Sequence, residues 1–119
     1  MRSKGYTDYR EMFDKEGLDA VAVVTPDYLH EEVVLEAAKR KIHILAQKPL
    51  STDIEQGKRM IQAAKENNVM LYVDFHKRFD PAHIQLRNAI KEGKLGEIEY
   101  GYVCMEDKIL VPSVWFKNW

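Results

Sequence analysis

Residues that could bind a ligand or move a proton gather at two places, each directly after an apolar run. Thr25 and Pro26 end the first run, and Gln47 and Lys48 end the second. An amphipathic segment of helical length separates the runs, which is the pattern of a strand, a crossover helix and a second, parallel strand. In open α/β sheets, ligands bind at the carboxyl ends of the strands. These four residues, with His30 shortly after the first turn, are therefore the first candidates for chemistry.

Lys48 is the candidate acid/base group of this set. It stands between the end of a strand and Pro49, whose ring restricts the turn. A lysine that is desolvated at such a place can exchange a proton near neutral pH, because burial disfavours its charged form. The alternative is a solvated turn lysine that takes no part in catalysis.

The other candidates also have purely structural interpretations. His30 either lines a cofactor site or is a polar residue on a helix face, and Thr25 with Pro26 either contacts a ligand or ends a strand. The basic cluster His76–Arg78 is either an anion site or a solvated loop. No His, Cys, Asp and Glu residues have the spacing of metal ligands, so we expect no metal site.

Three apolar runs have the length and content of buried strands: Leu18–Thr25, Ile42–Leu45 and Val69–Phe75. The first is rich in valine and lacks polar alternation, which indicates a strand buried on both faces of a parallel sheet. A fourth run, Ile98–Met105, predicts a further strand.

Four amphipathic segments alternate with these runs. The first begins at Thr7 or Asp8, the second follows Asp27, the third begins with the capping box Thr52–Glu55, and the fourth follows Asp80. The residues that we expect on their buried sides are Tyr9, Met12 and Phe13; Leu29, Val33, Val34, Ala37 and Ala38; Ile54, Gly57, Ile61 and Ala64; and Ile84, Leu86 and Ile90. Such alternation of helices and strands predicts an α/β fold, a parallel sheet with flanking helices.

Composition excludes several classes of function. The chain has 119 residues and a formal net charge of -1, with basic and acidic residues evenly mixed, so we expect no nucleic-acid partner. No apolar run approaches the roughly 18 residues that a membrane helix needs, so we expect no membrane partner. Cys104 is the single cysteine, which makes a reduced, cytoplasmic location the default expectation.

A Gly-rich turn after the first strand is typical of nucleotide-binding α/β units, because glycine lets the backbone approach the pyrophosphate. The six glycines of this chain nowhere have the G-x-G-x-x-G spacing. Either the chain does not bind a dinucleotide by itself, or that half of the fold lies outside it.

Four motifs together resemble those of the glucose–fructose oxidoreductase, inositol dehydrogenase and rhizopine-catabolism family (Gfo/Idh/MocA) of NAD(P)-dependent sugar dehydrogenases. They are Val24-Thr25-Pro26 with His30, Ala46–Leu50, Phe75–Pro81 and Gly93–Ile98, in the family's order and spacing over roughly residues 6–105. The resemblance implies the C-terminal half of a Rossmann domain over 1–80. Residues 81–119 would form a linking helix and the first strand of an α+β substrate domain. The Gly-rich turn would lie upstream of Met1, and a family histidine beyond Trp119.

The resemblance also implies a role for each candidate residue at the cofactor, NAD or NADP. Thr25 and Pro26 would line its nicotinamide–ribose side, with His30 beside them at the start of a helix. Arg78 would face the cleft near the nicotinamide.

Lys48 matches the lysine of the family's Glu-Lys-Pro motif, which contacts substrate and assists proton transfer as hydride moves. Gln47 departs from that motif, in which glutamate bonds the cofactor ribose. Glutamine can form hydrogen bonds there but brings no charge.

The sequence therefore predicts part of an oxidoreductase that moves hydride between NAD(P) and a hydroxyl carbon of a sugar or polyol. The chain alone is expected to be inactive, since cofactor-binding and partner residues lie outside it. The alternative is an α/β fragment without catalysis that acts as a structural or assembly module. In either case the strand at Ala20–Val24 would be a free, apolar edge. We expect a homodimer or higher oligomer through that edge or through the Ile98–Trp119 tail.

Overall fold

The computed structural model describes residues 4–104. The chain divides into two compact units, Met1–His83 and Ile84–Trp119. The division at residue 80 into a cofactor domain and a substrate domain stays a prediction. Each unit is described by itself.

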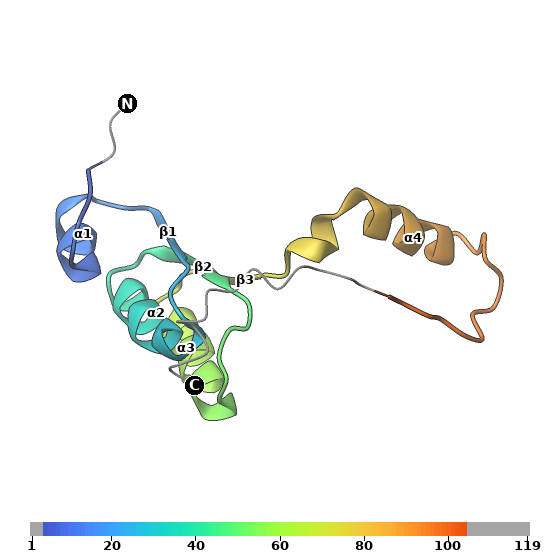
Figure 1. Ribbon diagram of the computed structural model, residues 1–119. Coiled ribbons are helices and arrows are strands. Elements are labelled where there is room, and N and C mark those ends of the chain that lie inside the picture. The colour runs from blue at the N-terminus through green and yellow to red at the C-terminus, as the bar shows by residue number, and fades with distance from the viewer. Residues whose placement is uncertain (1–3, 105–119) are drawn as a thin grey trace. The chain divides into compact units, whose positions relative to one another are not determined.

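A parallel sheet of three strands is the centre of the first unit (Figure 1). Its strands are β1 (Ala20–Val23), β2 (His43–Gln47) and β3 (Leu71–Asp74), in the order β1-β2-β3. The sequence prediction of three strands in a parallel α/β sheet is confirmed. In the described part of the chain β1 is an edge strand, as expected.

Helix α1 (Tyr9–Lys15) and helix α2 (His30–Lys39) precede β1 and β2. Of the two caps considered for α1, the structure uses Asp8, whose carboxylate accepts a hydrogen bond from the N–H of Arg10 at 2.8 Å. A short 3-10 turn, Asp27–Leu29, leads into α2. The apolar stripe predicted for α2 is buried at Val33, Val34, Ala37 and Ala38 but not at Leu29, which is exposed.

Helix α3 (Ile54–Glu66) begins one residue later than the predicted capping box implied. Asp53 is the cap, because its carboxylate accepts from the N–H of Gln56 at 2.8 Å. The predicted buried face is corrected as well. Met60 and Ala64 are buried, whereas Ile54 and Ile61 are exposed, so the helix turns a neighbouring stripe toward the core.

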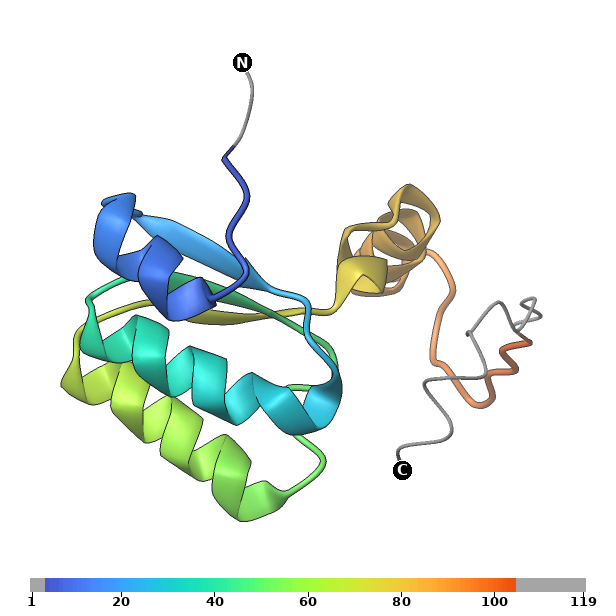
Figure 2. The ribbon, with the colours of Figure 1, turned by 60° about the vertical axis from the view of Figure 1, so that its left-hand side comes forward.

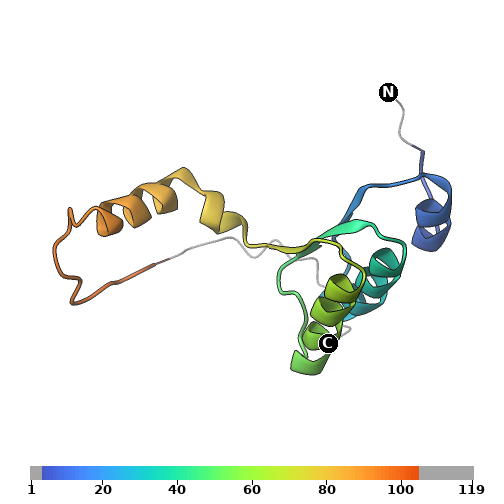
Figure 3. The ribbon, with the colours of Figure 1, turned by 180° about the vertical axis from the view of Figure 1, so that it is seen from behind.

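Helices α2 and α3 lie side by side along one face of the sheet (Figures 2 and 3). The core forms between these helices and that face, with Val34 and Met60 fully buried at its centre. Burying a side chain of this size stabilises a fold by about 1.5–3 kcal/mol. Phe13 of α1 joins the same core.

The opposite face of the sheet is bare among residues 4–83. Ala22, Leu45 and Tyr72 lie in register across β1, β2 and β3 and are all exposed, Leu45 by 42% and Tyr72 by 51%. The expectation that the first strand is buried on both faces is therefore wrong for this chain, because helices cover one face only. We call these three residues the bare-face row.

The second unit begins within helix α4 (Pro81–Lys91). Its predicted buried residues Ile84, Leu86 and Ile90 are exposed. The strand predicted at Ile98–Met105 is absent over residues 98–104, and Met105 lies outside the described residues. A strand needs a hydrogen-bonded neighbour, and residues 84–104 supply none.

Replacing Asp53 by alanine should lower the free energy of unfolding by about 1 kcal/mol, because the first turn of α3 loses its cap. Thr52→Ala is the matched control and should cost no more than about 0.5 kcal/mol, since the exposed Thr52 side chain caps nothing. Urea unfolding of both variants measures the difference. Equal losses would contradict the assignment of Asp53 as the cap.

Candidate functional site

Two turns that follow neighbouring strands form the centre of the candidate site. Val23 lies beside Ala46 in the parallel register of β1 and β2. Thr25 and Lys48 each follow two residues later, so both stand at the carboxyl edge of the sheet. The prediction that these residues share one end of the sheet is confirmed.

His30 connects the two turns directly. The ring is fully buried, and its Nε2 lies 2.9 Å from the carbonyl oxygen of Thr25. Its Nδ1 lies 3.1 Å from the carbonyl oxygen of Pro49 and 3.2 Å from that of Leu50. His30 does stand beside Thr25 at the start of a helix, as expected. Both ring nitrogens face the protein backbone, so this arrangement leaves neither of them for a cofactor.

Gln47 and Asp74 are neighbours in the register of β2 and β3. The amide Nε2 of Gln47 donates to the Asp74 carboxylate at 3.5 Å, and its Oε1 accepts from the backbone N–H of Lys48 at 2.8 Å. Sequence analysis placed Gln47 at the site but missed Asp74. The signal available was a charged residue at the end of an apolar strand.

Thr25 and Lys48 carry the atoms of this edge that lack partners. The hydroxyl oxygen of Thr25 is buried and has no hydrogen-bond partner among the described residues. The Lys48 side chain is exposed, and no hydrogen bond or ion pair in residues 4–104 involves its ammonium group. A buried polar atom without a partner is uncommon, because burial of a hydroxyl without a hydrogen bond costs free energy. Pro26, next to Thr25, is half-buried and begins the turn toward α2. The peptide bond between Lys48 and Pro49 is cis, which sequence analysis did not foresee.

The segment after β3 brings Arg78 to the same edge of the sheet. Arg78 is exposed within a short 3-10 helix, His76–Phe79, and its guanidinium carbon lies 6.0 Å from the centre of the Phe75 ring. Asp80 stands directly before helix α4 (Pro81–Lys91), and its carboxylate accepts a hydrogen bond from the backbone N–H of Ala82 at 2.9 Å. That hydrogen bond, with a smaller contribution from His83, holds the pKa of Asp80 below its usual value.

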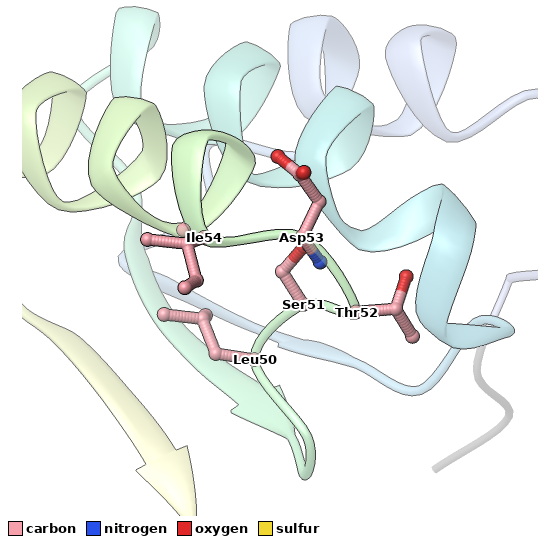
Figure 4. Close-up of a pocket in the computed structure, with 6 residues that line it drawn as sticks. Leu50, Ser51, Thr52, Asp53 and Ile54 are labelled. Carbon is pink, nitrogen blue, oxygen red and sulfur yellow. The ribbon is translucent and has the colours of Figure 1, made fainter.

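A shallow hollow lies at the start of α3, beside the turn that carries Lys48 (Figure 4). Its volume is about 220 Å³, and it is lined by Leu50, Ser51, Thr52, Asp53, Ile54 and Gly57. Ser51 accepts from the N–H of Asp53 at 3.0 Å and donates to the side chain of Gln56 at 2.9 Å. The side chains of Ser51 and Asp53 thus already have local partners within the hollow.

Neither a metal-binding cluster nor a membrane-spanning helix occurs among the residues that the structure describes. Residues 4–104 contain no group of three or more His, Cys, Asp or Glu side chains placed to hold a metal ion. None of the helices there is long and apolar enough to cross a bilayer.

Comparison with known proteins adds a family to this geometry. Residues 1–75 match the profile of GFO_IDH_MocA, an oxidoreductase family with an NAD-binding Rossmann fold. The chain is 35% identical over 94 residues to myo-inositol 2-dehydrogenase of Thermotoga maritima, which covers 79% of this chain and 28% of that protein. It is 32% identical over 111 residues to scyllo-inositol 2-dehydrogenase (NAD(+)) of Bacillus subtilis, and this match covers 93% of this chain and 32% of that protein.

A solved structure shows the same fold. The WlbA dehydrogenase of Bordetella pertussis, crystallised with NADH and UDP-GlcNAcA, superposes with a TM-score of 0.75 at 30% identity. The match covers 81% of this chain and 28% of that one. The chain thus spans about a third or less of the length of these relatives.

Replacing Gln47 by glutamate should destabilise the chain by about 1 kcal/mol at neutral pH, because two carboxylates would then stand opposite each other on β2 and β3. Protonation of one carboxyl in acid removes the repulsion, so the loss should shrink as the pH falls. Thermal unfolding at several pH values measures this. The double variant Gln47→Glu/Asp74→Asn is the control and should regain the lost stability. A loss that does not change with pH would contradict the pairing.

Proposed function

This chain belongs to the oxidoreductase family with an NAD-binding Rossmann fold, and we propose that its carboxyl sheet edge forms half of an NAD(P) cleft. The observation that carries the proposal is the convergence of three polar segments, Thr25–Pro26, Gln47–Lys48 and Arg78, on the ends of three parallel strands. Ligands of open α/β sheets bind at this place. Bound NAD(P) would supply the hydride acceptor or donor.

The side chains present fit such a cofactor. The unpartnered hydroxyl of Thr25 can bond to a nicotinamide or ribose group, and Pro26 beside it offers an apolar wall. The amide nitrogen of Gln47 can donate a hydrogen bond to a ribose hydroxyl if it gives up its 3.5 Å hydrogen bond to the Asp74 carboxylate. Arg78 brings positive charge close to a ligand that carries phosphates. His30 supports the cofactor site through the backbone of the two turns.

Lys48 is the residue that we propose for proton transfer. Its ammonium group is exposed beside the cleft and has no partner in residues 4–104, so it is available to a substrate hydroxyl. Removal of water around it by substrate and cofactor would favour its neutral form, which can accept a proton as hydride leaves the carbon. The substrate class proposed is a sugar or polyol, because two relatives are named as inositol dehydrogenases.

A second role, assembly through the bare sheet, is favoured by a different observation. The bare-face row and the free edge of β1 expose apolar surface that proteins seldom leave uncovered. We propose that a second copy of the chain pairs there, giving a homodimer or higher oligomer. The tail 98–119 is the other proposed contact, although residues 105–119 lie outside the described part.

We also propose a cytoplasmic location for the protein. In that reducing compartment the exposed thiol of Cys104 stays reduced.

Titration with NADH and NADPH, followed by cofactor fluorescence, tests the cleft. The chain should bind at least one of the two with a micromolar Kd. Thr25→Val should weaken binding about 5-fold, because it removes the unpartnered hydroxyl and keeps the shape. Thr52→Val is the matched control and should bind as the unaltered chain does. No saturable binding of either nucleotide would contradict the proposal and favour the assembly module.

Light scattering at high protein concentration tests the pairing. The unaltered chain should have at least twice the mass of a monomer. Leu45→Lys should shift it toward monomer, since it places a charge in the middle of the bare-face row. Ile54→Lys, at another exposed apolar position on α3, is the control and should leave the mass unchanged. A monodisperse monomer of the unaltered chain would count against this assembly.

A further inference from the structure

We propose that His30 is a positioning residue, whose ring bridges the Thr25 turn and the Lys48 turn through its two nitrogens and sets the spacing between them. The tether itself is a property of this chain. Its consequence for cofactor binding rests on the function proposed above.

The contacts of the ring are all with backbone carbonyl groups. Nε2 meets the carbonyl of Thr25 at 2.9 Å, and Nδ1 meets those of Pro49 and Leu50 at 3.1 and 3.2 Å. A carbonyl oxygen accepts hydrogen bonds and cannot donate them. A ring N–H on either side therefore donates to one of the two turns, and the ring lies between them.

His43, at the start of β2, provides a control in the same sheet. Its Nδ1 accepts a hydrogen bond from the backbone N–H of Met70 at 3.0 Å. That hydrogen bond joins His43 to the residue before β3 and involves neither of the two turns.

The two turns have no other direct link of this kind. The paired part of β1 ends at Val23, opposite Ala46. Among residues 4–104, no backbone hydrogen bond joins residues 24–29 to residues 48–53. The His30 ring fills this gap, since it is 0% exposed and reaches both turns from the first position of α2.

The position of this tether explains why it matters for the proposed cleft. The bonded carbonyls belong to Thr25 itself and to Pro49, the residue after Lys48. A shift of either turn would move the Thr25 hydroxyl relative to the Lys48 ammonium group. A misplacement of about 1 Å between reacting groups can cost roughly 100-fold in rate. His30 thus acts on the site through the backbone and touches neither cofactor nor substrate.

His30→Phe tests the tether, because it keeps a planar ring in the core and removes both ring nitrogens. Amide hydrogen exchange at Leu29 and Lys48, whose N–H groups donate within the two turns at 2.8 Å, should accelerate at least 10-fold, while exchange at Ile44 in the middle of β2 should stay the same. His30→Gln, which keeps polar groups, should recover part of the protection. His43→Phe is the control and should leave the two turns unchanged. If His30→Phe fails to fold, His30→Gln decides the question, because faster exchange at Leu29 and Lys48 supports the tether and unchanged exchange there overturns it.

Cofactor titration of the same variants separates the tether from the proposed function. His30→Phe should weaken NADH or NADPH binding at least 10-fold, and His30→Gln should weaken it less. If the unaltered chain binds neither nucleotide but the turns of His30→Phe do exchange faster, the proposed cleft fails and the tether stands. Unchanged exchange at Leu29 and Lys48 in a folded His30→Phe chain would overturn the tether.

Discussion

The parallel register between β1 and β2 is the constraint on which the rest of the structure depends. It places Val23 beside Ala46, and the chain then leaves both strands at the same edge of the sheet. Pairing of β2 with β3 extends that edge to Asp74 and the basic segment that follows it. A change of register would move Thr25 and Lys48 apart along the sheet, because residues rise by about 3.3 Å along a strand.

Burial on one side of the sheet maintains this register. Val23, Ile44 and Ala46 face helices α2 and α3 and are almost completely buried, so a slip by one residue would turn them toward solvent. Among residues 4–83, burial does not constrain the register on the other face of the sheet, because Leu45 and Tyr72 are exposed there. Residues 4–83 therefore form a sheet with helices on one face, whereas doubly wound α/β folds carry helices on both faces.

Local patterns predicted most of this fold, and long-range packing accounts for the differences. The spacing of apolar residues identified α2, and runs of aliphatic residues identified the three strands, because both signals arise within a few residues. The exposure of Ile84 on α4 and the lack of a strand at 98–104 could not be read from the sequence, since each depends on which partner elements are present. The site was predicted as a set of positions. The direction of the His30 ring was missed, because a buried histidine can satisfy its nitrogens in many ways.

The most direct test of the central claim is a map of backbone amide shifts during titration of the chain with NADH. The claim is that the carboxyl ends of the three strands form one binding edge. It predicts that the largest shifts occur at Thr25, Lys48 and Arg78, on three segments that are distant in sequence. Largest shifts at the amino ends of the strands, at Asp19 or Met70, or on a single segment only, would contradict it.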